Sequence, residues 1–127
     1  MRAVGVVQWL EEESQIDEVT ALSGSGPAYA FYLMESMQAA AEELGIAPEV
    51  ARLLTLETVY GAAKLALAAD EPPAELRRRV SSPGGTTERA IAQLEESGVR
   101  EAFARAIRAS RDRSRELAAK VSDGAAE

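Results

Sequence analysis

Seven small or hydroxyl-bearing residues stand in a row in the stretch SSPGGTT, residues 81–87. Pro83 fixes one backbone φ angle, whereas Gly84 and Gly85 can adopt backbone conformations that other residues avoid. An amphipathic helical pattern follows at once, so the free N–H groups and the positive dipole end of a helix lie beside this turn. Such a turn can bind a small anion, a carboxylate or a phosphate, without a basic side chain.

Thr87 is the side chain of this stretch best placed to meet such a ligand. Thr87, Ile91 and Leu94 have the i, i+4, i+7 spacing of one helix face, which puts the Thr87 hydroxyl on the inward face. The hydroxyl can donate or accept a hydrogen bond there, whereas Thr86 is turned away by about 100°. The alternative is that residues 81–87 only connect two helices, because the same residue types are common in plain turns.

A second run of small residues, SGSGP, spans residues 23–27. Pro27 suits the first turn of a helix, and Ser25 or Gly26 can cap that helix. The stretch is therefore either a cap with a kink or a second surface that a ligand approaches closely. Two such helix entries in one small chain favour a common site.

The composition excludes several kinds of chemistry. The chain has 0 Cys and 0 His, which rules out cysteine-based zinc sites, disulfide scaffolds, Cys or Ser–His nucleophiles and the Glu-x-x-His di-iron bundle. No EF-hand loop pattern is present, and we predict no metal site. A net charge of −7 argues against nucleic acid as a partner. Without a membrane-length apolar run or a signal-peptide pattern, we expect a cytoplasmic protein and no membrane partner.

The elements that must position these residues are predicted to be helices. Proline at a first turn and glycine just past a last turn, as at Gly45 and Gly98, delimit several of them. The predicted helices span residues 16–22, 27–44, 48–69, 74–80, 86–97 and 99–121. A short β-prone run, residues 4–10, has no partner strand in the chain and can be the last strand of another domain.

The predicted core is thin. Hydrophobic residues make up 46% of the 127 residues, and much of that is alanine, so the helices must pack closely or a second chain must complete the core. The last predicted helix carries a 4-3-4-3-4 spacing that is typical of a seam for another helix. This seam, with two serines at its centre, is formed by Phe103, Ile107, Ser110, Ser114, Leu117 and Val121.

Three stretches together resemble the C-terminal helical domain of the pyrroline-5-carboxylate reductase family. They are VTALSGSGPAYAFYLMESM (19–37), TVYGAAKL (58–65) and LRRRVSSPGGTTERAIAQLEESGVREAFARAIRASRDRSREL (76–117). The most specific part is the signature Val-x-Ser-Pro-Gly-Gly-Thr-Thr-x-x-Ala-Ile. The resemblance covers roughly residues 4–117.

The resemblance implies an all-α helical bundle that forms an interlocked homodimer, with a short residual β-strand at the N-terminus. Enzymes of this family reduce Δ1-pyrroline-5-carboxylate to L-proline, the last step of proline biosynthesis, with hydride from NADPH or NADH. Their N-terminal Rossmann domain holds the nucleotide, the substrate sits at the dimer interface, and dimers often assemble further into larger rings.

The resemblance also implies roles for individual residues. Four residues of the turn would hold the substrate carboxylate, mainly through backbone N–H groups: Ser82, Gly84, Gly85 and Thr86. Thr87 would be the catalytic residue, hydrogen-bonding the ring nitrogen as hydride reaches the neighbouring carbon. Ser25 and Gly26 would lie on the nicotinamide side.

The chain departs from the family by having no Gly-x-Gly-x-x-Gly and no βαβ region. We therefore expect residues 1–14 to be a remnant of the nucleotide-binding domain, 15–122 the dimerisation and substrate domain, and 123–127 a frayed tail. The chain would bind NADPH or NADH incompletely, and we expect it to be inactive by itself. Two alternatives remain: a helical dimerisation module without a ligand, and a module that binds some other small carboxylate.

Overall fold

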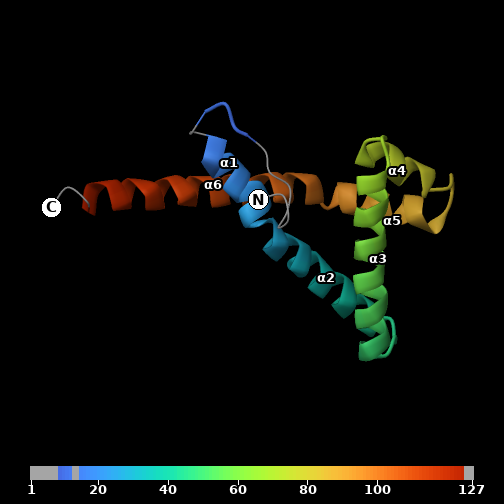
Figure 1. Cartoon of the computed structure of the whole chain (residues 1–127). Coiled ribbons are helices and arrows are strands. Elements are labelled where there is room, and N and C mark those ends of the chain that lie inside the picture. Colours follow the sequence, from blue (N-terminus) through green and yellow to red (C-terminus); the bar gives the residue numbers. More distant parts are fainter. Residues whose placement is uncertain (1–8, 13–14, 125–127) are drawn as a thin grey trace. The chain divides into compact units, whose positions relative to one another are not determined.

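The computed structural model describes residues 9–12 and 15–124, and Figure 1 labels its helices. Every regular element among these residues is helical, which confirms the predicted all-α fold. No helix in this part of the chain is long and apolar enough to cross a membrane. The elements are α1 (Ile16–Val19), the π-helix η3 (Thr20–Gly24), α2 (Gly26–Glu43), α3 (Pro48–Ala68), α4 (Pro73–Arg79), α5 (Thr86–Glu96) and α6 (Val99–Gly124).

Local sequence signals explain where α2 and α3 meet. Gly45 follows α2 with a φ of 88°, and its N–H donates to the Glu42 carbonyl over 2.9 Å. The next N–H, of Ile46, donates to the Ala41 carbonyl over 3.1 Å. This pair of bonds is the Schellman motif, which satisfies carbonyls left open at a helix end. Pro48 then opens α3 at a position where its missing N–H is not needed.

Two predictions concern the N-terminal part of the chain, a strand at residues 4–10 and a helix at residues 16–22. Most of the predicted strand, residues 4–10, lies outside the described residues, and Trp9 and Leu10 belong to no helix or strand. The helix predicted at 16–22 continues instead as η3, where the Ser25 N–H reaches the Thr20 carbonyl over 2.9 Å. This i→i+5 bond widens the last turn before α2.

The chain divides into two compact units, each described here by itself. The first contains the residues up to Pro27 together with those from Glu101 onward, so it joins α1 and η3 to most of α6. The second contains Ala28–Arg100 and therefore most of α2, all of α3, α4 and α5, and the SSPGGTT turn.

In the first unit, the serines of the predicted seam on α6 contact the chain's own first helices. The Ser114 hydroxyl donates to Oδ1 of Asp17 over 2.6 Å, and Ser110 and Ser25 share a hydrogen bond of 2.9 Å. Arg115 adds an ion pair with Glu18 at 2.5 Å. The small, polar middle of the seam therefore holds α1 and the start of α2.

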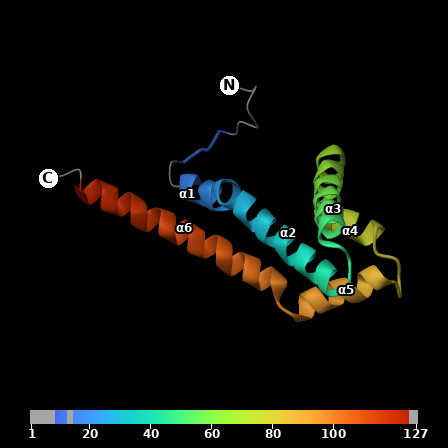
Figure 2. The same cartoon turned by 90° about the horizontal axis from the view of Figure 1, so that it is seen from below.

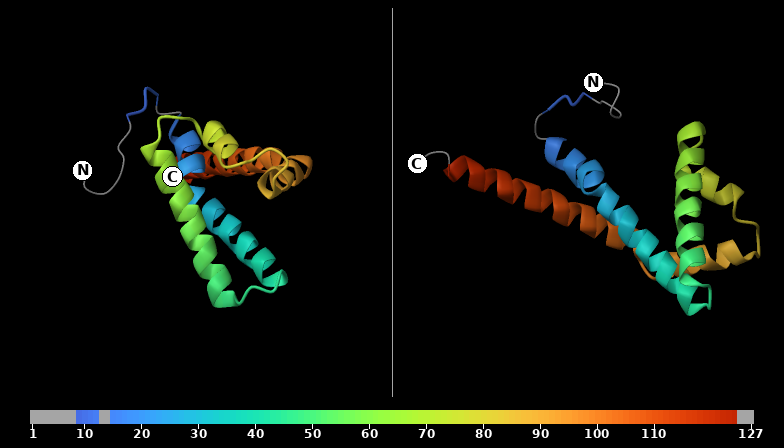
Figure 3. Two further views of the ribbon diagram at one scale, coloured as in Figure 1. Left: turned by 90° about the vertical axis from the view of Figure 1, so that its right-hand side faces the viewer. Right: turned by 60° about the horizontal axis from the view of Figure 1, so that its bottom comes forward.

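In the second unit, α2 and α3 meet at the Gly45 turn and diverge away from it (Figures 2 and 3). A groove lies between them, lined by Phe31, Met34, Glu35, Gln38, Ala39, Glu42, Arg52, Thr55 and Leu56. Two of the few buried residues among those described, Ala51 and Thr55, lie on α3.

Large apolar side chains of α2 and α3 remain exposed in the single chain. Phe31 is 66% exposed and Tyr60 is 61% exposed, although both belong to helices with apolar faces. Others with more than a third of their surface exposed are Tyr32, Leu33, Val50, Leu53, Leu54, Leu56, Leu65 and Leu67. The buried apolar residues of the described part are Ala21, Ala51 and Leu76. The core is therefore as thin as the alanine-rich composition predicts.

Candidate functional site: the turn between α4 and α5

The SSPGGTT stretch forms a tight turn that leads directly into α5. The Gly85 N–H donates to the Ser82 carbonyl over 3.0 Å, which closes a four-residue β-turn. Pro83 and Gly84 are its central residues, and Gly84 has a φ of 70°. Proline followed by a residue of positive φ is the pattern of a type II turn, in which glycine is strongly preferred at the second central position.

Gly85 is the N-cap residue of α5, and the crowding around it explains why it is a glycine. A Cβ atom at this position would lie 3.0 Å from the Ser82 carbonyl oxygen, which is tighter than nine in ten real Cβ contacts. Gly85 therefore has no side chain with which to cap the helix. The N–H groups at the start of α5 are left to other acceptors.

Contacts on both sides hold the turn in place. On the α4 side, the Ser81 hydroxyl donates to the Arg77 carbonyl over 2.8 Å. The Arg77 guanidinium forms an ion pair with Glu95 near the other end of α5, also at 2.8 Å. Leu76 of α4 is 9% exposed and anchors this segment in the second unit. The turn is thus bounded by two helices that are themselves joined.

The first turn of α5 carries several backbone donors without acceptors in the helix. The regular pattern begins only with Arg89, whose N–H donates to the Gly85 carbonyl over 3.3 Å. The three N–H groups before it, of Thr86, Thr87 and Glu88, precede the first intrahelical bond, as at any helix start. They follow Gly84 and Gly85 in the chain, and the N–H groups at the start of a helix are suited to bind an anion.

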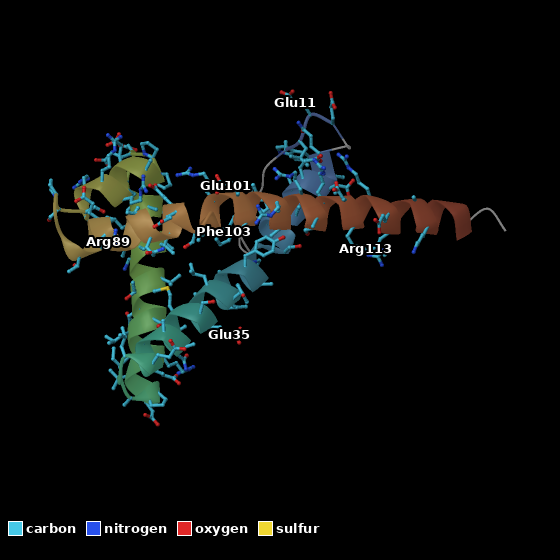
Figure 4. All side chains as sticks on the ribbon, turned by 180° about the vertical axis from the view of Figure 1, so that it is seen from behind. Glu11, Glu35, Arg89, Glu101, Phe103 and Arg113 are labelled. Carbon is cyan, nitrogen blue, oxygen red and sulfur yellow. The ribbon has the colours of Figure 1, made fainter. Side chains whose placement is uncertain are left out.

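The structure places the predicted substrate-binding residues together on this one turn, mostly exposed. Ser82, Gly84, Thr86 and Thr87 are exposed in the single chain, and Gly85 is half-buried. A shallow hollow lies beside them, lined by Gly84, Gly85, Glu88, Arg89 and Ala92. Arg89 is labelled on α5 in Figure 4. The inward position predicted for Thr87 corresponds to no buried surface within the single chain.

Glu88 is a feature of the turn that the sequence analysis missed. Its Oε2 accepts a hydrogen bond of 2.6 Å from the Gly84 N–H, a donor predicted to serve a ligand. A glutamate at the third position of a helix is the usual residue of a capping box, which reaches back to a free N–H. That spacing, Gly85-x-x-Glu88, is the sequence signal that could have found it.

The residues predicted on the nicotinamide side, Ser25 and Gly26, lie in the first unit. Ser25 follows η3, and its half-buried hydroxyl is hydrogen-bonded to Ser110 of α6. Gly26 begins α2, and a Cβ atom there would meet nothing within 4 Å. The two residues therefore form an open backbone surface beside a hydroxyl whose position α6 determines.

Several charged groups of the first unit are paired, among them Arg111 with Asp112 and Arg113 with Glu116. Hydrogen bonds to Asp112, and the charge of Asp112, raise the pKa of Arg111 above its ordinary value, so this guanidinium is positive at neutral pH. Among the described residues of the whole chain, no group of three or more Asp or Glu side chains could hold a metal.

Comparison with known proteins places these features in a family context. A family model described as pyrroline-5-carboxylate reductase dimerisation matches residues 13–117. The pyrroline-5-carboxylate reductase of Pseudomonas aeruginosa is 52% identical over 118 residues, covering 93% of this chain and 43% of that protein. The reductase of Corynebacterium melassecola is 50% identical over 105 residues, covering 83% and 39%.

The chain is also similar in structure to solved reductases. A pyrroline-5-carboxylate reductase from Coxiella burnetii matches 91% of this chain with a TM-score of 0.89 and 52% identity. The Plasmodium falciparum pyrroline carboxylate reductase with NADP bound matches 89% with a TM-score of 0.84 and 29% identity. In both cases the match covers 43% of the other chain, so this chain spans less than half the length of these proteins.

Proposed function

We propose, because this chain belongs to the pyrroline-5-carboxylate reductase dimerisation family, that it provides the dimer interface and the substrate pocket of such a reductase. The observation that carries the proposal is the glycine-rich turn at the start of α5. Its type II geometry and unpaired helix donors suit a small carboxylate, and it is the most specific part of the family signature.

The exposed apolar faces of α2 and α3 support a homodimer. Phe31 and Leu56 line the groove between these helices, and both are more than a third exposed. An apolar surface of this extent is typical of a protein–protein interface. Because the matched family is defined by dimerisation, we propose that a second copy of this chain covers it, and that the dimers can assemble further into a ring.

Within the substrate pocket, the N–H groups of Gly84 and Thr86, together with Ser82 and Gly85, would hold the carboxylate of Δ1-pyrroline-5-carboxylate. The Gly85 N–H itself donates to the Ser82 carbonyl, so Gly85 would contribute by closing the turn. Thr87 follows directly in the chain and would hydrogen-bond the ring nitrogen, so the ring is fixed at two points. Positioning of this kind is the main catalytic contribution that a protein makes to a cofactor reaction.

NADPH or NADH would supply the hydride. The NADP-bound relative supports this cofactor class. The regular elements of the described residues are all helices, whereas dinucleotides are commonly held by a βαβ unit. We therefore propose that most of the nucleotide contacts come from a part of the reductase outside residues 15–124. Ser25 and Gly26 would face the nicotinamide. We further propose that the reaction takes place in the cytoplasm.

A second candidate is a helical dimerisation module without a ligand. The exposed faces of α2 and α3 favour it equally, because they support association whether or not the turn binds anything. The turn therefore decides between the two functions.

An NMR titration of the 127-residue chain tests the proposal. L-proline, the product, is compared with cyclopentanecarboxylate, which keeps the ring and the carboxylate but lacks the nitrogen. We expect amide shifts concentrated at residues 82–87 with both ligands, and a weaker response of Thr87 to the analogue. If neither ligand moves these amides at millimolar concentration, while the chain is dimeric, the module without a ligand is the better account.

A further inference from the structure

The Glu88 side chain turns back from α5 onto the turn that precedes it. Its Oε2 lies 2.6 Å from the Gly84 nitrogen and accepts that hydrogen bond. Under the proposed function, the same N–H binds the carboxylate of the substrate. A carboxylate of the chain itself therefore holds a donor that the ligand needs.

We propose that Glu88 is a built-in competitor of the substrate carboxylate, which must release Gly84 before the ligand binds with full affinity. This inference rests on the proposed function, and it assigns a role to a residue outside the SSPGGTT stretch. Glu88 would thereby set how weakly carboxylate ligands, including the product, are held.

The geometry of the hydrogen bond differs from that of an ordinary helix cap. In a capping box, the glutamate at the third helical position reaches the N–H of the N-cap residue. Here the N-cap is Gly85, and its N–H already donates to the Ser82 carbonyl over 3.0 Å. Glu88 reaches one residue further, to Gly84 in the turn itself. It thus occupies the anion-binding side of the turn rather than only closing the helix.

Because the Glu88 side chain is exposed, a ligand carboxylate can readily replace it at the Gly84 N–H. Glu88 is exposed, so its side chain can rotate into water without leaving a buried charge behind. A ligand that brings its own carboxylate offers the Gly84 N–H an equivalent acceptor. The exchange therefore replaces one charge-assisted hydrogen bond with another.

The charged residues that line the adjacent hollow also support competition between Glu88 and a bound carboxylate. Of the five residues that line it, Glu88 and Arg89 are the charged ones. Their charges offset each other, and a bound carboxylate adds a second negative charge beside Glu88. When the Glu88 charge is removed, Arg89 is the one charged residue among the five that line the hollow, and its positive charge favours binding of an anion. We expect a gain in affinity of about two- to fivefold, the range that one charge at a helix N-terminus produces.

The test is a titration of the 127-residue chain with L-proline at low ionic strength, followed at the backbone amides of Ser82 and residues 84–87. Glu88→Gln removes the charge with little change in shape, and Glu88→Ala also removes the acceptor. Glu96→Gln is the matched control, because it removes the same charge from the last residue of α5. L-prolinamide, which lacks the carboxylate, is the control ligand.

Both Glu88 variants should bind L-proline about two- to fivefold more tightly than the unaltered chain, whereas Glu96→Gln should not. Their affinity for L-prolinamide should not rise, because this ligand has no carboxylate and carries a net positive charge. If L-proline shifts residues 82–87 but binds all four proteins equally, the role of Glu88 is overturned and the proposed function stands. If these amides do not respond in any protein, the proposed function fails and the role of Glu88 fails with it.

Discussion

The Ser114 hydroxyl donates a hydrogen bond to Oδ1 of Asp17 over 2.6 Å, joining α6 to α1 across 97 residues of chain. Both side chains are half-buried. Arg115, the next residue of α6, lies 3.7 Å from the other Asp17 oxygen. One carboxylate near the start of the chain is thus held by two neighbouring residues of the last helix, and it fixes the segment that leads through η3 to Ser25.

We expect Ser114→Ala to lower the free energy of unfolding by about 1 to 2 kcal/mol, because it leaves a partly buried carboxylate short of one charge-assisted hydrogen bond. Urea unfolding at a fixed chain concentration measures the change, since dimerisation would otherwise contribute to apparent stability. Ser36→Ala is the control. Its hydroxyl bonds the Tyr32 carbonyl within α2 on an exposed face, so the loss should stay within about 0.5 kcal/mol.

A double-mutant cycle with Asp17→Asn separates this hydrogen bond from other effects of either change. If the two residues interact as the structure indicates, the double variant loses less stability than the sum of the single variants. Full additivity would mean that the contact contributes nothing to stability.

The second expectation concerns Gly84, whose φ of 70° lies in the left-handed region. Gly84→Ala should cost about 1 to 2 kcal/mol of folding stability, because a Cβ atom disfavours this backbone conformation even where space is free. Thermal unfolding is the measurement. Gly26→Ala is the matched control, since Gly26 starts α2 with a negative φ and open space around it. Equal effects of the two substitutions would contradict the turn geometry.

The helix ends show how much of the fold could be predicted from sequence. Gly45, Pro48 and Gly98 act through their own backbone preferences, so the boundaries of α2, α3 and α5 fell within one or two residues of the prediction. The π-turn of η3 could not be predicted in this way. It leads directly to Ser25, which is hydrogen-bonded to Ser110, and a contact between segments so far apart in the sequence carries no local signal.

In the candidate site, too, some features were predictable from local sequence and others required the folded structure. The anion-binding character of residues 81–87 follows from proline, glycine and a helix start, all of which are local. The spacing Gly85-x-x-Glu88 is a local signal that Glu88 reaches back to the turn. Its actual partner, Gly84, was not predictable from that spacing, because a capping box would pair Glu88 with the Gly85 N–H, which here donates to the Ser82 carbonyl. The thin core was predictable from the alanine content, whereas the groove between α2 and α3 required the angle at which they diverge.

The third expectation concerns the exposed face of α2. Phe31 is 66% exposed and lines the groove, so Phe31→Glu should leave the isolated helices intact but place a charge in the proposed interface. We expect the dimer dissociation constant to rise by at least about tenfold, because an unpaired buried charge is costly. Analytical ultracentrifugation over a range of concentrations measures it. The control, Glu96→Gln on α5, should leave it unchanged, and an unaltered constant for Phe31→Glu would place the interface elsewhere.

The last expectation separates the hydroxyl of Thr87 from its shape. Under the proposed function, Thr87 hydrogen-bonds the ring nitrogen, whereas the N–H groups of the turn hold the carboxylate. Thr87→Val keeps the shape and removes the hydroxyl, while Thr87→Ser keeps the hydroxyl. A net hydrogen bond at an exposed site contributes about 1 kcal/mol, so Thr87→Val should weaken L-proline binding about fivefold and Thr87→Ser much less.

Cyclopentanecarboxylate is the control ligand for Thr87. Both variants should bind it as the unaltered chain does, because it has no ring nitrogen with which the Thr87 hydroxyl could form a hydrogen bond. Calorimetric titration with the two ligands measures the difference. If Thr87→Val weakens both ligands equally, the residue acts on the carboxylate or on the turn, and the assignment of the ring nitrogen to Thr87 is wrong.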